Sequence, residues 1–304
     1  MIRLSLAVLL VTTAGCQDKS SKLIKSWKVG TSSGLFNDFS KQEFESFKKS
    51  GIDFIEIGSG VFRDKSDDEC RKWVEDIRTN AEAAGIQIWS IHLPFSRVYD
   101  ISTLNDTDRV NMISECRRII NLCAPLKPAK FVIHGSSEPI ADSIRTQRIQ
   151  NSVASLKLLS AEAQKMNGQL ALECLPRTCL GNTADELLQI VNEVGSDLGV
   201  CFDSNHLLKE KPEEFVAKIG SKITTLHISD FDGVDERHWL PGDGIINWTE
   251  VVSELVKSGY KGPFMFEASK RKPGIDGSVS TAKLTTTELY SSFQQIKEKY
   301  LTTL

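Results

Sequence analysis

From Trp27 to the C-terminus, short apolar runs alternate with longer amphipathic segments. The apolar runs have the length and continuous hydrophobicity of buried parallel strands, and the segments between them place apolar residues at helical spacing. The apolar runs cover residues 28–31, 54–57, 86–92, 130–134, 169–174, 198–203, 223–229 and 263–267. The amphipathic segments that follow them cover residues 41–49, 68–84, 106–123, 140–166, 184–194, 212–219, 248–258 and 281–300. The pattern therefore predicts eight consecutive strand-helix units.

Eight such units in 304 residues favour a single (β/α)8 barrel, a TIM barrel of the α/β class, over an open doubly wound sheet. A doubly wound sheet usually carries a glycine-rich phosphate loop after its first strand, and the sequence contains no GxGxxG motif. With 40% hydrophobic residues the chain can bury one large core, so one domain over residues 27–304 is expected. In such barrels the chemistry lies at the C-terminal ends of the strands, and polar residues there are the candidates.

The first sixteen residues have the layout of an export signal. Arg3 gives a positively charged start, residues 4–11 are apolar, and Thr-Ala-Gly-Cys ending at Cys16 resembles a bacterial lipoprotein cleavage site. We therefore expect residues 1–16 to be a lipoprotein-type signal peptide, Cys16 to be lipidated and residues 17–26 to be a polar tether. The threonine that replaces the usual leucine leaves ordinary secretion open. Either way the protein is expected in the periplasm or cell envelope, and it would meet the membrane only through a lipid anchor.

Charge and cysteine content narrow the function further. A formal net charge of −3 and a pI near 6.0 give no basic footprint for a nucleic-acid backbone, so a nucleic-acid partner is not expected. The seven cysteines form no CxxC pair and are few for the chain length, so they do not indicate a disulfide framework.

Four predicted strands end on residues that can bind a metal ion. The residues are Glu173, Asp203, His227 and Glu267. Capping of the next helix explains Asp203 equally well. It explains the two glutamates poorly, because each ends an apolar run, where a carboxylate costs several kcal/mol unless it is paired or coordinated. Three carboxylates and one imidazole suit one divalent ion: Mn²⁺, Mg²⁺, Co²⁺ or Zn²⁺.

All five histidines of the chain follow the same rule. His92, His134, His206, His227 and His238 each fall at a predicted strand end or in the loop after it. A single histidine in an apolar run is usually a core residue with a satisfied hydrogen bond. Five of them at one end of the barrel indicate a functional site.

The ordered motifs resemble those of the xylose isomerase-like TIM-barrel superfamily of sugar isomerases and epimerases, over nearly the whole chain after the signal. The motifs are Leu-Glu at Glu173, Phe-Asp-Ser-Asn-His from Phe202, Leu-His-Ile-Ser-Asp from Leu226, Glu236-Arg237-His238, Pro-Gly-Asp-Gly from Pro241, and Phe-Glu at Glu267.

The resemblance to the ketose 3-epimerases of that superfamily implies a metal site and a mechanism. Glu173, Asp203, His227 and Glu267 would hold one divalent ion, and the two glutamates would also be catalytic. The metal would polarise a carbonyl, one glutamate would remove the neighbouring C–H proton to give an enediolate, and the other would return a proton. The further residues expected to contact the sugar or support the ligands are His92, His134, His206, Arg237, His238, Trp239 and Glu56.

A second branch of the superfamily resembles the chain at other positions. Apurinic endonuclease-type barrels build a three-zinc cluster, and His92, His134, His206 and Glu236-Arg237-His238 occupy similar places. The chain lacks the glycine-rich segment expected after Glu173 and has no basic surface, so DNA repair is disfavoured. A second metal bound by His92, His134 and Glu173 stays open.

The predicted function is that of an exported, divalent-metal-dependent sugar isomerase or epimerase acting on a small sugar or keto-sugar. A lyase or hydratase on an oxidised sugar would begin with the same proton abstraction and stays an alternative. A non-catalytic carbohydrate-binding lipoprotein is a third, although a pure binder does not need paired glutamates. The identity of the sugar and metal and any homo-oligomer stay open.

Overall fold

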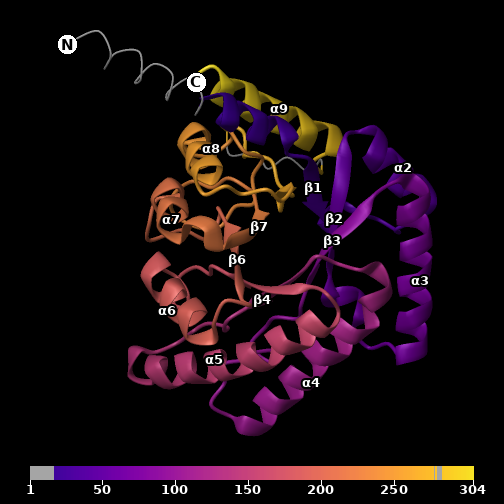
Figure 1. Ribbon diagram of the computed structural model, residues 1–304, viewed down its shortest axis with the longest axis vertical. Coiled ribbons are helices and arrows are strands. Elements are labelled where there is room, and N and C mark those ends of the chain that lie inside the picture. The colour runs from indigo at the N-terminus through magenta and orange to yellow at the C-terminus, as the bar shows by residue number, and fades with distance from the viewer. Residues whose placement is uncertain (1–16, 277, 279–282) are drawn as a thin grey trace, which may run out of the picture.

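The computed structural model describes residues 17–276, 278 and 283–304, and within them the chain folds as the predicted barrel (Figure 1). One eight-stranded parallel sheet has the order β7-β6-β5-β4-β3-β2-β1-β8. The strands are Val29–Ser32 (β1), Ile52–Gly58 (β2), Gln87–His92 (β3), Lys130–His134 (β4), Gln169–Glu173 (β5), Gly199–Asp203 (β6), Ile223–His227 (β7) and Phe264–Phe266 (β8). All eight predicted strands are confirmed.

The two ends of the sheet meet just beyond the last strands. The Ile228 N–H donates to the Met265 carbonyl at 2.8 Å, and the Glu267 N–H donates to the Ile228 carbonyl at 3.0 Å. These two hydrogen bonds close the barrel beside the end of β7. They also fix the backbone of Glu267 against that of the residue after His227.

The helices surround the sheet in the order that the sequence predicts (Figure 1). They are Lys41–Lys49 (α2), Asp67–Ala84 (α3), Asp106–Leu122 (α4), Asp142–Lys165 (α5), Ala184–Val194 (α6), Pro212–Ile219 (α7), Trp248–Lys257 (α8) and Thr286–Leu301 (α9). Short 3-10 turns lie at Ser33–Leu35, Ser59–Phe62, Ala124–Leu126 and Gly220–Lys222. Helix starts are fixed by local sequence: Ser66 and Thr285 each form a capping box with the glutamate three residues on.

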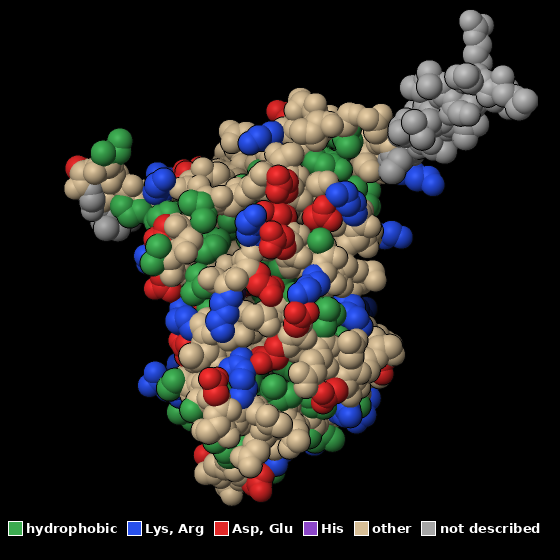
Figure 2. Space-filling view, turned by 90° about the vertical axis from the view of Figure 1, so that its left-hand side faces the viewer, with side chains coloured by type: hydrophobic (Ala, Val, Ile, Leu, Met, Phe, Trp, Pro, Cys, Tyr) green, Lys and Arg blue, Asp and Glu red, His purple; other side chains and the backbone are tan. Residues whose placement is uncertain are grey.

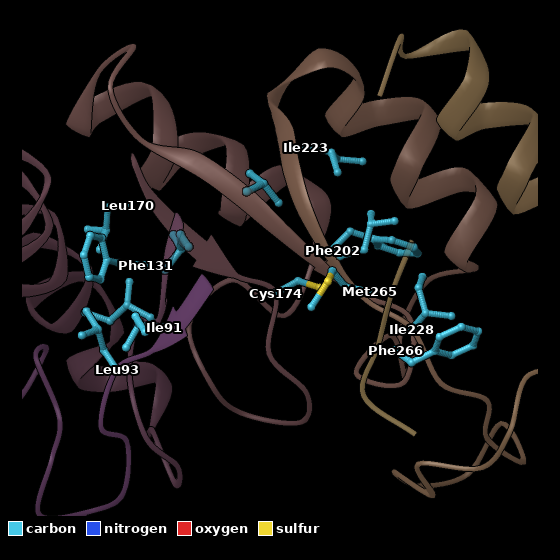
Figure 3. Packing of buried hydrophobic residues seen from close by; sticks show 14 of the residues in the cluster. Ile91, Leu93, Phe131, Leu170, Cys174, Phe202, Ile223, Ile228, Met265 and Phe266 are labelled. Carbon is cyan, nitrogen blue, oxygen red and sulfur yellow. The ribbon is translucent and has the colours of Figure 1, made fainter. Parts of the chain in front are cut away.

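The main core lies between the sheet and the helices. The outward-facing strand residues, such as Phe131, Phe202 and Phe266, are fully buried in it (Figure 3). Inside the barrel, Val132, Ala171 and Cys201 form a separate small apolar cluster. The packed interior gives the residues at the strand ends a rigid floor.

The segment before β1 differs from the expected tether. Residues 17–26 are helical, Ile24 is fully buried, and the Trp27 indole donates to the Tyr260 carbonyl at 2.9 Å. The polar composition of the segment concealed this, because a single isoleucine supplies its fully buried contact. The helix lies beside α9 (Figure 1), and the Gln17 amide contacts the Leu304 carbonyl.

Cys16 and the predicted signal lie outside the described residues. Within the described ranges, none of the helices is both long and apolar enough to cross a membrane.

Candidate active site

The strand register brings the predicted residues to one level of the barrel. His134 on β4 lies beside Glu173 on β5, and Asp203 on β6 lies beside His227 on β7. Each is the last residue of its strand, and the alternation of side chains along a strand allows it to point into the barrel. Glu267 follows β8 directly. The site is therefore assembled from five neighbouring strand ends.

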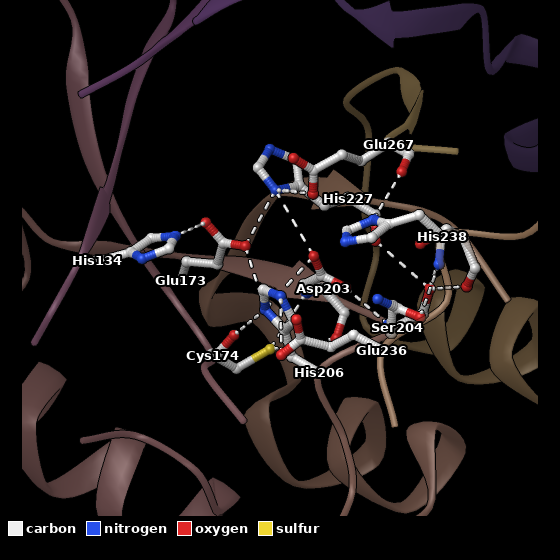
Figure 4. Close-up of polar contacts among 12 residues, drawn as sticks. His134, Glu173, Cys174, Asp203, Ser204, His206, His227, Glu236, His238 and Glu267 are labelled. Atoms are coloured by element: carbon white, nitrogen blue, oxygen red, sulfur yellow. Dashed lines mark hydrogen bonds and ion pairs between the residues drawn. The ribbon is translucent and has the colours of Figure 1, made fainter. Parts of the chain in front are cut away.

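His227 is the centre of the predicted ligand set (Figure 4). Its Nδ1 atom lies 3.2 Å from Glu173 Oε1, 3.2 Å from Glu267 Oε2 and 3.9 Å from Asp203 Oδ2. One ligand atom from each of the four residues lies within 4.8 Å of all the others. The four predicted metal ligands are thus brought together.

The contacts on the opposite side of the His227 ring determine whether Nδ1 carries a proton. Its Nε2 lies 3.0 Å from Glu56 Oε1, and Ser90 donates to the other oxygen of the same carboxylate at 2.7 Å. The tautomer that satisfies Glu56 carries the proton on Nε2, so the Nδ1 lone pair points at three carboxylates. A lone pair facing anionic oxygens repels them unless a proton or a metal ion lies between.

Asp203 gives an independent test of that fit. Its Oδ1 accepts the Asn205 N–H at 2.6 Å within the turn after β6, so Asp203 does not cap the next helix, which begins at Pro212. Its Oδ2 is buried and has no hydrogen-bond partner among the described residues. An unpartnered carboxylate oxygen inside a protein is costly, and a divalent cation is a partner that would satisfy it. The donor set therefore fits a divalent metal ion.

Glu173 is surrounded by imidazoles. Its Oε1 lies 3.2 Å from His227 Nδ1 and 3.3 Å from His206 Nδ1. Its Oε2 lies 3.1 Å from His92 Nε2 and 3.2 Å from His134 Nε2. The two oxygens thus face two separate groups of ring nitrogens, and His92, Glu173 and His227 form a second set of metal-ligand geometry.

A backbone carbonyl fixes the tautomer of His92, as the Glu56 carboxylate fixes that of His227. His92 Nδ1 lies 2.9 Å from the Leu93 carbonyl, so it carries a proton there. In a neutral ring, Nε2 then presents a lone pair to Glu173. Burial lowers the pKa of His92, but the hydrogen bond and charge of Glu173 outweigh it and raise the pKa to about 9. Without metal, a proton occupies the space between the two residues.

Electrostatics divide the carboxylates of the site. Burial and the charges of Glu267 and Glu173 raise the pKa of Asp203 well above its ordinary value. Burial also acts to raise the pKa of Glu173, but His227 and His134 more than offset it and hold that pKa well below its ordinary value. Burial likewise opposes ionisation of Glu267, and the His227 charge lowers its pKa overall. Two ionised glutamates therefore flank a protonated aspartic acid when no metal is bound.

A cavity of about 220 Å³ opens above this cluster. Of the predicted residues, His92, His134, Glu173, His206, His238 and Glu267 line it. A larger groove of about 510 Å³, bordered by Leu208, Pro212 and Ile245, holds none of the converging ligands. We therefore place the candidate active site in the smaller cavity.

Three expected substrate contacts are not found in the cavity lining. Glu56 is 2% exposed and lies behind His227, so of the two roles expected for it, contact with the sugar or support of a ligand, its position fits the support of His227. Arg237 Nε pairs with Asp232 at 2.7 Å, which holds its side chain away from the cavity. Trp239 exchanges backbone hydrogen bonds with Asp230 and is 9% exposed. His238 itself has a left-handed backbone, with φ 51°, and its N–H donates to Asn205 Oδ1 at 3.2 Å; its side chain lines the cavity while those of its two neighbours do not.

Asp230 organises the loop that carries His238. Its carboxylate accepts N–H groups of Phe231, Gly242 and Ile246 and the Trp248 indole. Gly244 packs so closely that an added Cβ would lie 2.1 Å from Asp230 Oδ1. Gly244, the second glycine of the Pro-Gly-Asp-Gly motif, is thus needed for this close approach.

The same loop brings Glu236 over the site. Its Oε1 is buried without a hydrogen bond, 3.0 Å from Arg177 Nη1 and 4.0 Å from His206 Nε2. Arg177 also pairs with Glu138 at 2.8 Å and Asp235 at 2.9 Å, and so ties three loops together at the cavity mouth.

Sequence reasoning missed part of the cavity wall. The Phe95 ring packs on His134 at 4.1 Å and on His92 at 5.0 Å, and is 52% exposed. The further lining residues are Ser136, Ser137, Glu138, Leu175, Pro176, Arg177, Cys179 and Glu236. All lie in strand-to-helix loops, where no periodicity marks which side chains turn inward. The sequence signal available for these residues was that each follows a predicted strand.

Comparison with known proteins places the chain. The xylose isomerase-like TIM barrel family matches residues 44–287, and the chain belongs to this family. An uncharacterised protein of Methanocaldococcus jannaschii, MJ1311, is 30% identical over 264 residues, covering 82% of this chain and 86% of the relative. The inosose isomerase of Halalkalibacterium halodurans is 28% identical over 161 residues, covering 49% and 57%.

A solved structure supports the architecture. The D-psicose 3-epimerase of Clostridium cellulolyticum H10 superposes with a TM-score of 0.72 at 21% identity, covering 90% of this chain and 98% of that chain. At this identity the likeness bears on the fold.

Proposed function

We propose that the protein is a divalent-metal-dependent sugar isomerase or epimerase. The observation that carries the proposal is the placement of Glu173 and Glu267, each 3.2 Å from the same His227 nitrogen. Both carboxylates line the cavity, and their lowered pKa values mean that both are ionised, which is the form that a general base requires. The names of the inosose isomerase and D-psicose 3-epimerase relatives are consistent with this chemistry.

The chain's own residues supply the proton transfers. A bound divalent ion, held by Glu173, Asp203, His227 and Glu267, would act as a Lewis acid toward a carbonyl oxygen of the sugar. One glutamate takes the proton from the carbon beside the carbonyl, and the C–H electron pair moves into an enediolate. The other glutamate, protonated in the course of turnover, gives a proton back to carbon on the opposite face or to the neighbouring carbon. Starting material and product are isomers, so no oxidant or co-substrate is needed.

The cavity wall suits a polyol. His134, His206 and His238 line it, and imidazole rings can exchange hydrogen bonds with hydroxyl groups. Phe95 presents an apolar face at the same opening, against which the C–H side of a sugar can pack. Arg177 is engaged by carboxylates, which leaves it poorly placed to bind a phosphate.

A multinuclear hydrolase is the second candidate, because one observation favours it. His92 and His134 both approach Glu173 Oε2, so a second cation there would have two imidazoles and a shared carboxylate as ligands. A DNA substrate still lacks support. On the face in Figure 2, basic and acidic side chains are interspersed, with no continuous basic patch.

The experiment is deuterium exchange together with metal counting. Protein with added Mn²⁺ is incubated with candidate ketoses in D₂O, and carbon-bound deuterium is detected by NMR. About one ion per chain and exchange that Glu267→Gln abolishes are expected. Exchange without change of configuration or carbonyl position, followed by loss of water, would point to the lyase or hydratase. A sugar that binds without exchange would leave a carbohydrate-binding protein.

Export and lipid anchoring are a separate part of the proposal. They rest on the Arg, apolar run and Thr-Ala-Gly-Cys order that ends at Cys16. In cells that process lipoproteins, Cys16→Ser is expected to release the protein from the membrane fraction. Persistent membrane association of this variant would mean that the signal had been misread.

A further inference from the structure

The barrel end opposite the candidate active site is lined with lysines. The N-terminal face is defined here by the segments that lead from each helix into the next strand. Four lysines lie in these turns and three more are the last residue of a helix: Lys28, Lys127, Lys222 and Lys261, and Lys49, Lys165 and Lys257. One acidic residue, Asp197, lies in the same turns. The chain as a whole is acidic, at −3, so the excess of positive charge is local to this face.

Most of these lysines form no ion pair within the described part of the chain. All are exposed except Lys222, which is half-buried. Lys165 pairs with Glu162 and Lys257 with Glu254, each within its own helix. For the other five, no carboxylate lies within ion-pair distance among the residues described. Favourable placement at a helix C-terminus accounts for Lys49, Lys165 and Lys257, but not for the four in the turns.

The chain enters the barrel at the same face. Each helix runs back from the C-terminal ends of the strands, so α9 finishes at the N-terminal face, where Gln17 contacts Leu304. The described part of the chain therefore begins beside this lysine-rich surface. Two further exposed lysines, Lys19 and Lys25, lie on the helix that begins there. That helix is itself packed against the barrel, because it holds the fully buried Ile24.

We propose that the N-terminal face is a docking surface for an anionic lipid bilayer. Lysine ammonium groups would interact with lipid phosphates while their alkyl stems remain against the protein. A lipid anchor combined with a basic surface binds an anionic membrane more tightly than either feature alone. Docked in this way, the barrel holds its catalytic mouth away from the membrane and open to solutes. The orientation part rests on the lipid anchor proposed above; the charge interaction does not.

The test uses the chain from Gln17 onward, which contains all eight strands and their helices and no lipid. It is mixed with vesicles of phosphatidylcholine alone or with about a third phosphatidylglycerol, and sedimentation is measured at low and high salt. We expect binding to the anionic vesicles only, lost when salt shortens the screening length to about 3–5 Å.

Matched variants identify the surface. Lys127→Glu/Lys222→Glu/Lys261→Glu is expected to lower binding at least tenfold, on the order of three lost lipid contacts. Lys65→Glu/Lys209→Glu/Lys211→Glu, on strand-to-helix loops, changes the net charge equally and should bind within about twofold of the parent. Circular dichroism and thermal unfolding confirm that both triple variants fold.

Three results would overturn the inference. Equal loss in both variants would show that net charge alone matters. Equal binding to neutral vesicles would remove the charge argument. Retention on heparin or RNA without binding to vesicles would assign the surface to another polyanion. Deuterium exchange on the same samples separates the proposals, because the N-terminal-face variant leaves the cavity residues unchanged.

Discussion

The Asp203→Asn variant is expected to have opposite effects on the metal-free and metal-loaded protein. Asparagine keeps the oxygen that accepts the Asn205 N–H and replaces only the unpartnered Oδ2. Ligand atoms of Asp203, Glu173 and Glu267 lie within 4.8 Å of one another. At an effective dielectric constant near 20, two ionised carboxylates at that distance repel by about 3 kcal/mol. Protonation of Asp203 relieves part of this repulsion in the parent, so we expect the free energy of unfolding of the metal-free variant to exceed that of the parent by about 1–3 kcal/mol.

With metal the sign reverses. An ion present at a hundred times its dissociation constant stabilises the parent by about 2.7 kcal/mol, and the variant lacks one anionic ligand. The assay is thermal unfolding of both proteins with EDTA and with Mn²⁺. At about 2 °C per kcal/mol for a chain of this size, the variant should melt several degrees higher in EDTA and show little metal-induced shift. An unchanged metal-induced shift, or a lower melting temperature in EDTA, would refute the reasoning.

The pH dependence gives a second readout of the same group. Because the folded pKa of Asp203 is raised, the proton on its carboxyl favours the folded state. That contribution is full below the ordinary value of 3.8 and is lost as the pH rises through the folded pKa. The Asn variant has no such proton to lose, so the difference in stability between the variant and the metal-free parent should grow from acidic toward neutral pH.

Three further predictions concern other parts of the site. Glu267→Gln should keep the melting temperature within a few degrees and lower deuterium exchange by at least about 10³-fold, and an unchanged rate would remove the two-glutamate mechanism. The free energy of unfolding of the metal-free protein should fall by on the order of 3 kcal/mol as the pH rises from about 6.5 through about 9, because the raised pKa of His92 favours its protonated form in the folded state. In denaturant titrations, His92→Gln should reduce this dependence of stability on pH. Gly244→Ala should cost about 2–4 kcal/mol, because its Cβ would meet the Asp230 carboxylate, and a normal melting temperature would contradict the role given to this loop.

The order of the strands and the cluster of proposed metal ligands could be predicted from the sequence. Each buried parallel strand is a continuous apolar run, so a terminal Glu173 or His227 stands out against it. The barrel topology then brings the strand ends together without further information. This is why the four proposed ligands were found in one place.

The loop residues could not be predicted in the same way. The sequence Glu236-Arg237-His238 gives no sign that Arg237 turns to Asp232 while both neighbours face the cavity. That outcome depends on the extended pairing of Trp239 with Asp230, a contact between residues nine apart within one irregular loop. For Glu56 the sequence left two roles open, because its depth in the barrel, below His227 and not at the cavity, is a property of strand register.

The two oxygens of Glu173 connect the competing functions. Oε1 belongs to the His227 group and Oε2 to the His92 and His134 group, so one carboxylate can serve one cation or bridge two. With a single ion at His227, His92 and His134 remain hydrogen-bonding groups beside the proton-transferring glutamate. With a second ion at their nitrogens, Glu173 would have both oxygens engaged and could no longer accept a proton from carbon. Metal stoichiometry in the active protein is therefore a test of mechanism: one ion per chain is compatible with Glu173 as a base, and two are not.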